Sequence, residues 1–215
     1  MSNDKEKIAA HLLNINAVVL QPDDPFTWSS GLKAPIYCDN RLTLSYPAIR
    51  CDIANGFAER IRAQYPEVEV IAGAATGGIA HAAWVSEKLD VPMVYVRGKA
   101  KDHGKKSQIE GVVKPGQKVV VIEDLISTGT SSLAVAEALR NEGCEVQAVL
   151  AIFSYDLEEA KAAFSKARIP YETLTDYPTL INVAVQTGKI SPQQLTLLKR
   201  WHQNPKHSDW MKQPH

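Results

Sequence analysis

The feature that most constrains the fold is a run of four apolar residues, Val119-Val120-Val121-Ile122, which no polar residue interrupts. A strand with one face in water alternates apolar and polar side chains, whereas a strand buried on both faces is apolar throughout. Strands of the second kind occur mainly in parallel sheets that helices cover on both sides. The run therefore predicts a central strand of an α/β fold.

Segments of strand and helix character alternate around this run. The expected strands are 69–74, 93–97, 118–122, 145–153 and 171–174, and the expected helices that accompany them are 79–89, 129–141, 157–167 and 178–187. Such alternation predicts a mainly parallel sheet with helices on both faces. Ahead of it we expect helices at 5–16 and 46–64. The segment 18–46 is rich in Pro, Gly and Ser, which is typical of short antiparallel strands and turns.

Length and charge exclude several classes of protein. The 215 residues fit one domain, and the 24 basic and 24 acidic residues cancel, so no overall field favours nucleic acid or a membrane surface. No apolar stretch approaches the ~20 residues of a membrane span, and no signal peptide is evident. The spacing of Cys38, Cys51 and Cys144 fits neither a zinc site nor a disulfide framework. We expect a single-domain cytoplasmic protein with no nucleic-acid or membrane partner.

The segment after the apolar run carries the first functional signal. It reads Glu123-Asp124-Leu125-Ile126-Ser127-Thr128-Gly129-Thr130-Ser131 and leads into a helix. Small and hydroxyl residues at a strand-to-helix turn offer backbone N–H groups, hydroxyls and a positive helix end to a phosphate. Adjacent carboxylates would repel that ligand unless hydroxyl donors or a metal meet them, and a ribose 5-phosphate supplies hydroxyls. The plain alternative is that the hydroxyls only cap the helix and the acids are solvated.

This segment closely resembles the phosphoribosyl diphosphate signature of the type I phosphoribosyltransferases. The resemblance implies that family's α/β fold, a central, mainly parallel sheet flanked by helices, with a small N-terminal hood at about 18–46. It implies that the two acids hold the ribose hydroxyls and that the turn holds the 5-phosphate, with Asp124 also among the catalytic residues. The implied donor contacts are Glu123, Asp124, Leu125, Ile126, Ser127, Thr128, Gly129, Thr130 and Ser131.

A strongly basic segment lies between two expected core strands, at about 97–116. Between residues 97 and 106 it carries the basic residues Arg97, Lys99, Lys101, Lys105 and Lys106, against a single acid, Asp102. A long charged loop in this place predicts a flexible lid over the site, and its plain alternative is a solvated loop.

The pattern Arg-x-x-x-Lys-Asp-His-Gly in this segment resembles the catalytic loop of orotate phosphoribosyltransferases, which closes over the diphosphate bound by the neighbouring subunit. The resemblance implies that Arg97, Lys101 and His103 contact the diphosphate, with Lys101 the leading catalytic candidate. It also implies a homodimer in which the two subunits share the loop.

Two further segments agree with this family. Phe26-Thr27-Trp28-Ser29-Ser30-Gly31 resembles its hood, whose continuation implies that Tyr37 and Cys38 face orotate, together with Ser127; otherwise it is simply a pair of edge strands. Gly73-Ala74-Ala75-Thr76-Gly77-Gly78 resembles its diphosphate loop, although a tight turn that needs glycine is the commoner meaning of such a segment. Charge alone suggests that Arg41 meets the orotate carboxylate.

The chain departs from well-known bacterial members at four positions. Ser29 stands where they have Lys, Thr76-Gly77 where they have Tyr-Lys, and Gly98 where a second basic residue usually follows the loop arginine. These choices resemble the subgroup represented in Bacillus relatives. They leave open whether Ser29, Thr76 and Gly77 contact the donor.

The implied reaction joins orotate to 5-phosphoribosyl 1-diphosphate, giving orotidine 5′-monophosphate and diphosphate in de novo pyrimidine biosynthesis. Mg²⁺ is the expected cofactor, bound mainly through the donor diphosphate and water, and no protein side chain is expected to ligate a metal. Two alternatives are a type I enzyme for a purine or uracil, and a non-catalytic regulator that senses the donor and binds nucleic acid. The segment 203–215 is expected to be a loosely ordered tail, with Trp201 and Trp210 docking on the domain.

Overall fold

The computed structural model describes residues 2–28, 31–98 and 108–211. The chain divides into two compact units, of which the first comprises Met1–Thr43 with Thr175–His215 and the second comprises Leu44–Leu174. The expectation of a single domain concerns how the two units sit together, and it stays a prediction.

A six-stranded sheet in the order β10-β9-β8-β5-β6-β7 organises the second unit. Its strands are β5 (Val70–Ala74), β6 (Met93–Val96), β7 (Ile109–Glu110), β8 (Lys118–Ile126), β9 (Glu145–Ser154) and β10 (Tyr171–Asp176). The pairs β5/β6, β5/β8 and β8/β9 are parallel, and β7 is antiparallel to β6. The mainly parallel sheet that the sequence predicted is thereby confirmed.

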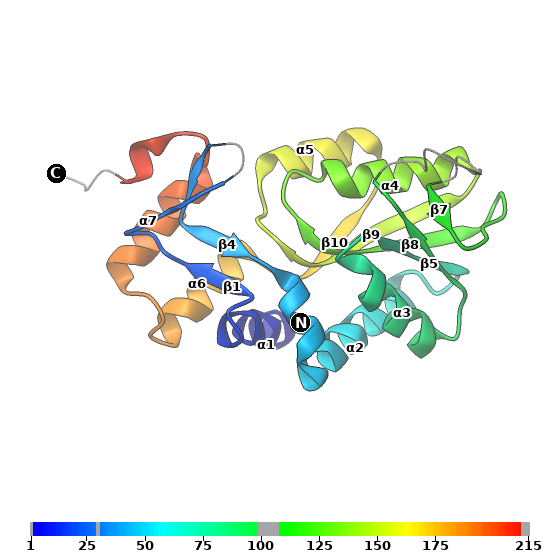
Figure 1. The fold of residues 1–215 in the computed structure, drawn as a ribbon, viewed down its shortest axis with the longest axis horizontal. Coiled ribbons are helices and arrows are strands. Elements are labelled where there is room, and N and C mark those ends of the chain that lie inside the picture. The colour runs from blue at the N-terminus through cyan, green and yellow to red at the C-terminus, as the bar shows by residue number, and fades with distance from the viewer. Residues whose placement is uncertain (1, 29–30, 99–107, 212–215) are drawn as a thin grey trace. The chain divides into compact units, whose positions relative to one another are not determined.

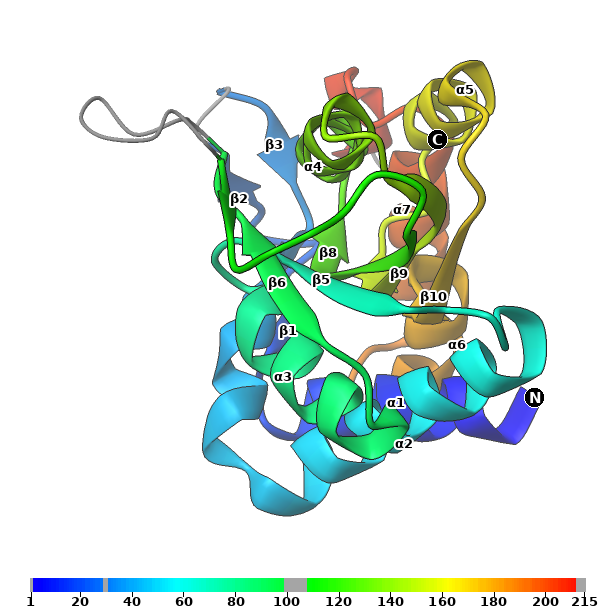
Figure 2. The same cartoon turned by 90° about the vertical axis from the view of Figure 1, so that its right-hand side faces the viewer.

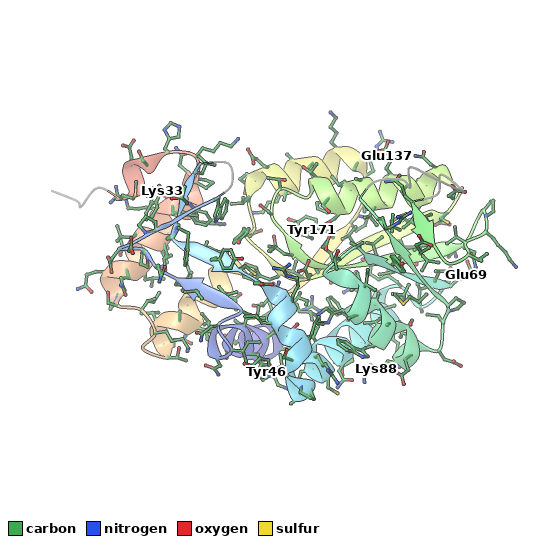
Figure 3. The ribbon with its side chains drawn as sticks, in the orientation of Figure 1. Lys33, Tyr46, Glu69, Lys88, Glu137 and Tyr171 are labelled. Atoms are coloured by element: carbon green, nitrogen blue, oxygen red, sulfur yellow. The ribbon has the colours of Figure 1, made fainter. Side chains whose placement is uncertain are left out.

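Helices cover both faces of this sheet, as Figures 1 and 2 show: α4 and α5 lie on one face, and α2 and α3 on the other. They span α2 (Pro47–Gln64), α3 (Gly78–Leu89), α4 (Thr130–Asn141) and α5 (Glu158–Ala167). All four residues of the apolar run in β8 are completely buried, which confirms its central place. Tyr171 of β10, labelled in Figure 3, stacks on Phe164 of α5 with ring centroids 4.4 Å apart.

Strand β8 is longer than the sequence predicted. We expected it to end at Ile122, but it continues to Ile126 because β9 runs beside it and pairs with it over that whole length. Glu123 lies opposite Ala151, and Ile126 lies opposite Ser154. The acid pair therefore belongs to a strand, whose hydrogen-bonded backbone holds it more firmly than a turn would.

The first unit joins the two ends of the chain. Its elements are α1 (Ser2–Asn14), β1 (Val18–Leu20), β2 (Phe26–Thr27), β3 (Lys33–Ala34), β4 (Ile36–Cys38), η1 (Asn40–Ser45), α6 (Tyr177–Gln186), α7 (Pro192–Gln203) and η2 (Ser208–Met211). Strand β1 is antiparallel to β4, and β2 is antiparallel to β3, so the short antiparallel strands predicted for this segment are confirmed. Asp176 ties the ends together, because it caps α6 at the Thr179 N–H and pairs with Lys5 at 2.7 Å.

Helix α7 follows α6 in the first unit, although the sequence predicted no element there. Ser191 and Gln194 form a capping box at the start of α7. Trp201 of this helix is completely buried and packs edge-on against Trp28, with ring centroids 5.9 Å apart. Docking of Trp201 and Trp210 was expected, and η2 buries Trp210 to 3% exposure; the residues up to 211 are more ordered than the loose tail that was expected from 203.

Among residues 2–28, 31–98 and 108–211, no helix combines the length and the apolar character that crossing a bilayer requires.

Candidate active site

Three of the segments singled out in the sequence meet at one edge of the sheet. The strands β5, β6 and β8 are parallel neighbours, so their carboxyl ends lie at the same edge. The loop 75–78 follows β5, Arg97 follows β6, and the turn that begins at Ser127 follows β8. Ligands of open α/β sheets bind at this edge.

The turn after β8 leaves its hydroxyl groups available to a ligand. Helix α4 begins after Gly129, which adopts a left-handed conformation with φ of 81°, and no side chain caps the helix. Thr128, Thr130 and Ser131 are exposed, and the hydroxyls of the two threonines lie 3.1 Å apart. The alternative in which these hydroxyls merely cap the helix therefore does not describe this turn.

Gly129 is required at the start of α4 for two reasons. Its positive φ disfavours any residue with a Cβ atom. A Cβ at this position would also lie 2.7 Å from Cε2 of Phe164, which is itself buried against α4. The turn is therefore fixed by the core beneath it.

Glu123 is a buried acid with both carboxylate oxygens engaged. Only 5% of the residue is exposed. Its Oε2 accepts a hydrogen bond of 3.1 Å from the Ser132 hydroxyl, and its Oε1 accepts one of 3.1 Å from the Asp124 N–H. Burial and then the negative charge of Asp124 raise the pKa of Glu123 to about 8.

Asp124 lies against the loop that follows β5. A Cβ built on Gly77 would come within 2.3 Å of the Asp124 carboxyl carbon, so only glycine leaves room for this carboxylate. Gly78 is equally confined, because its Cβ would lie 2.2 Å from the Ile122 carbonyl oxygen. The Gly77-Gly78 pair thus allows the loop after β5 and the start of α3 to pack closely against β8. Asp124 is half-buried and remains the more accessible of the two acids.

Leu125 and Ile126, two of the predicted donor contacts, continue β8 between the acids and the turn. Ile126 is completely buried within the core on the α4 side of the sheet, and Leu125 is half-buried. Of these two residues, the backbone of Ile126 accepts a hydrogen bond of 3.1 Å from the Tyr155 N–H. Both residues anchor the turn, and contact with the donor stays a prediction for them.

Arg97 lies at the end of β6, where it pairs with Glu110 of β7 at 3.4 Å. Both side chains are mostly buried, with 27% and 30% exposed respectively. The Arg97 N–H donates to the Gln108 carbonyl oxygen at 2.9 Å, and the Gln108 side chain returns a bond of 3.2 Å to the Arg97 carbonyl oxygen. Arg97 is therefore held in place by the strand on its outer side.

Several predicted positions lie outside the described residues. Lys101 and His103 of the basic loop are among them, and so is Ser29 of the hood. Their roles stay predictions.

The predicted orotate residues Tyr37 and Cys38 lie in β4 of the first unit. Tyr37 is 46% exposed and packs against Phe26, with ring centroids 5.7 Å apart. The Cys38 thiol donates to the Asn40 side chain at 3.4 Å. Ser127 belongs to the second unit, so each of these residues is placed within its own unit only.

Arg41 already holds a carboxylate of its own chain. Its Nε and Nη2 donate to the two Asp39 oxygens at 2.7 Å and 2.9 Å. The Arg41 hydrogen bond lowers the pKa of Asp39. A guanidinium engaged in such a fork has fewer donors for a second carboxylate, and its contact with orotate stays a prediction.

Two residues at this edge escaped the sequence analysis: Ser132, which holds Glu123, and Glu110, which holds Arg97. Neither stands in a motif that points to chemistry. The sequence did hold one signal for Glu110. It is an acid at the far end of the basic loop, and the two ends of a loop lie close together, so it could pair with Arg97 at the start of the loop.

Within 2–28, 31–98 and 108–211, no group of three or more His, Cys, Asp or Glu side chains is arranged to hold a metal ion.

Comparison with known proteins gives a consistent result. The phosphoribosyl transferase domain model matches residues 45–175. The chain is 60% identical to the orotate phosphoribosyltransferase of Bacillus caldolyticus, covering 94% of this chain and 97% of that protein. It is 56% identical to the orotate phosphoribosyltransferase of Halalkalibacterium halodurans, covering 96% and 99%. The crystal structure of the Aeropyrum pernix orotate phosphoribosyltransferase superposes with a TM-score of 0.72 at 28% identity, covering 86% and 99%. The chain therefore belongs to the phosphoribosyltransferase family and, within it, to the orotate phosphoribosyltransferases.

Proposed function

We propose that this chain transfers ribose 5-phosphate from 5-phosphoribosyl 1-diphosphate to orotate, giving orotidine 5′-monophosphate and diphosphate in de novo pyrimidine biosynthesis. The observation that carries the proposal is the acid pair at the end of β8 followed directly by an uncapped hydroxyl turn. The identity of 56% and 60% to named orotate phosphoribosyltransferases supports orotate as the acceptor.

The reaction exchanges one bond at the anomeric carbon of the ribose for another. The bond to the diphosphate oxygen breaks, and the electron pair leaves with diphosphate. A ring nitrogen of the orotate anion supplies the pair for the new carbon–nitrogen bond. Since orotate is itself the nucleophile, the protein needs no covalent intermediate, and its contribution is positioning and charge stabilisation.

The donor would lie along the carboxyl edge of the sheet. The hydroxyls and N–H groups from Ser127 to Ser131 suit the 5-phosphate, because the start of α4 adds the positive end of a helix. Of the acid pair, the more accessible Asp124 suits the ribose hydroxyls, which can donate to a carboxylate. Arg97 lies two strands away and suits the diphosphate.

Family resemblance assigns the remaining roles. Lys101 and His103 would assist departure of the diphosphate, with Lys101 the leading catalytic residue. Tyr37, Cys38 and Ser127 would contact orotate. Closure of the basic loop would exclude water from a positively charged ribose centre.

Mg²⁺ is the proposed cofactor, bound mainly through the diphosphate of the donor and water. Mg²⁺ dehydrates reluctantly and commonly binds through substrate phosphates. When bound, it supplies positive charge to the leaving diphosphate, a task that Arg97 would share from the end of β6.

A cytoplasmic homodimer is the proposed assembly. If the basic loop closes over the site of the neighbouring subunit, as in the loop that it resembles, one chain cannot form a complete site. A two-fold interface would give each site the loop of the other subunit.

The direct test is the ultraviolet absorbance of orotate in the presence of 5-phosphoribosyl 1-diphosphate and Mg²⁺. We expect loss of orotate that requires the donor, with orotidine 5′-monophosphate as product. Turnover of uracil or a purine in place of orotate would overturn the substrate. A protein that turned over no base but bound the donor and nucleic acid at moderate salt would be the regulator instead.

A further inference from the structure

Ser132 lies beneath the candidate site, in the first turn of α4, and is almost completely buried at 1% exposure. Its hydroxyl donates 3.1 Å to Oε2 of Glu123, nine residues earlier in the chain. A buried helical serine commonly donates to a carbonyl of its own helix. Ser86 of α3 does so, at 2.9 Å from the Ala83 carbonyl oxygen. The hydroxyl of Ser132 instead connects a helix to a strand.

Glu123 carries this connection on to the next residue. One oxygen takes the Ser132 hydroxyl and the other takes the N–H of Asp124. With 5% of the residue exposed, the Glu123 carboxyl has little freedom to turn toward a ligand. The two hydrogen bonds of the Glu123 carboxyl therefore suit a role in fixing the backbone of Asp124.

The position of Asp124 leaves little tolerance. The Gly77 backbone lies so close that a single added carbon would come within 2.3 Å of the Asp124 carboxyl group. A shift of the strand backbone at Asp124 would press this carboxylate into the loop 75–78 or withdraw it from the ligand edge. A displacement of about 1 Å is enough to reduce donor binding and reaction rate strongly. The Asp124 carboxylate is sensitive to such a displacement because it must meet two hydroxyls of one ribose.

We propose that Ser132 is a positioning residue for the donor: it holds the Glu123 carboxyl, which holds the backbone of Asp124 and so aims the Asp124 carboxylate at the ribose hydroxyls. This inference rests on the proposed function. It assigns Ser132 a role in donor affinity and none in the binding of orotate.

The test compares Ser132→Ala with Ser86→Ala. Both variants lose one buried serine hydroxyl from a helix, but only Ser132 touches the acid pair. Calorimetric titration with 5-phosphoribosyl 1-diphosphate and Mg²⁺ gives the donor Kd, and steady-state kinetics give kcat and the KM of each substrate. We expect the donor Kd and KM of Ser132→Ala to rise about five- to tenfold, since hydrogen bonds to a charged or ionisable group are among the stronger ones. The KM of orotate should stay within about twofold, and Ser86→Ala should match the wild type in both.

Unchanged donor affinity in a folded Ser132→Ala protein would overturn the inference, and so would an equal loss in Ser86→Ala. A wild-type protein that bound no donor would overturn the proposed function and the inference together, so the two failures are distinguishable.

A double-mutant cycle tests the route through Glu123. If Ser132 acts through that carboxyl, Ser132→Ala should weaken donor binding little further in a Glu123→Ala protein. Losses that add in full would show that Ser132 acts by another route and would overturn the inference.

Discussion

Burial changes the ionisation of Glu123, the first acid of the pair. Burial and the charge of Asp124 raise the pKa of Glu123 from an ordinary 4.5 to about 8. Between these two values the folded chain keeps a proton that the unfolded chain releases. Folding then takes up a proton, so the free energy of unfolding falls as the pH rises through this window.

Glu123→Gln should remove this dependence, because glutamine keeps the shape of the side chain and does not ionise. From pH 5 to pH 9 we expect the wild type to lose on the order of 4 kcal/mol more stability than the variant. Urea unfolding at pH 5, 7 and 9 measures the free energy of unfolding of both proteins. The difference between them isolates Glu123, because all other titrating groups are common to both. Parallel stability profiles would mean that Glu123 ionises normally in the folded chain.

Gly77→Ala should damage donor binding, because the new methyl group would lie 2.3 Å from the Asp124 carboxyl carbon. We expect the donor KM to rise about tenfold or more, which corresponds to a loss of about 1.4 kcal/mol in binding. Gly56→Ala is the matched control in α2, where the nearest atom is the flexible Leu174 side chain at 3.2 Å. The same donor KM in both variants would show that the space at Gly77 has no bearing on the site.

At the scale of elements, the short strand β7 fixes both ends of the basic segment. Tyr95 of β6 pairs with Glu110 of β7, and Val96 pairs with Ile109. The end of β6, just before Arg97, and β7, where the chain returns, are therefore held side by side. The ion pair between Arg97 and Glu110 joins the same two strands. The orientation of Arg97 at the end of β6 therefore depends on β7.

Glu110→Gln tests this dependence. Loss of the carboxylate should release the Arg97 guanidinium and raise the donor KM by about threefold, at a stability cost of about 1 kcal/mol or less. Glu67→Gln, which removes the partner of Lys118 at the amino end of β8, is the control for losing an ion pair. A donor KM that does not respond to Glu110→Gln would remove Glu110 from the site.

The elements also show which parts of the fold a sequence can predict. Strands of the central sheet were predicted because their apolar runs are local signals, as in Val119–Ile122. Helix α7 was missed although Ser191 and Gln194 spell a capping box and Leu195, Leu198 and Trp201 follow at helical spacing. The contact of Ser132 with Glu123 has no local signal, because it depends on how α4 packs against β8.

At the scale of the whole molecule, the first unit unites segments that are far apart in the sequence. Lys5 and Asp176 are 171 positions apart and form an ion pair of 2.7 Å. Helical and strand periodicity indicate that each segment has an apolar face, but they do not say which face covers which. The fold class was therefore predictable, whereas the joining of 1–43 with 175–215 required the structure.

The proposed homodimer makes a prediction that no single chain can satisfy. A complete site would combine Asp124 of one subunit with Lys101 of the other. Lys101→Ala and Asp124→Asn should each abolish activity in their own homodimers. In a mixed dimer, however, the Lys101→Ala chain supplies an intact Asp124 and the Asp124→Asn chain supplies an intact loop, so one of the two sites is complete.

Equal amounts of the two inactive proteins, allowed to exchange subunits, should regain about a quarter of the wild-type activity per chain, because half the dimers are mixed and each has one complete site. Native mass spectrometry with one tagged variant confirms the exchange. A loop acting on its own subunit leaves every site with one defect, so proven exchange without recovered activity would rule out the shared site. Recovery that rises and falls with the fraction of mixed dimers would tie catalysis to the assembly.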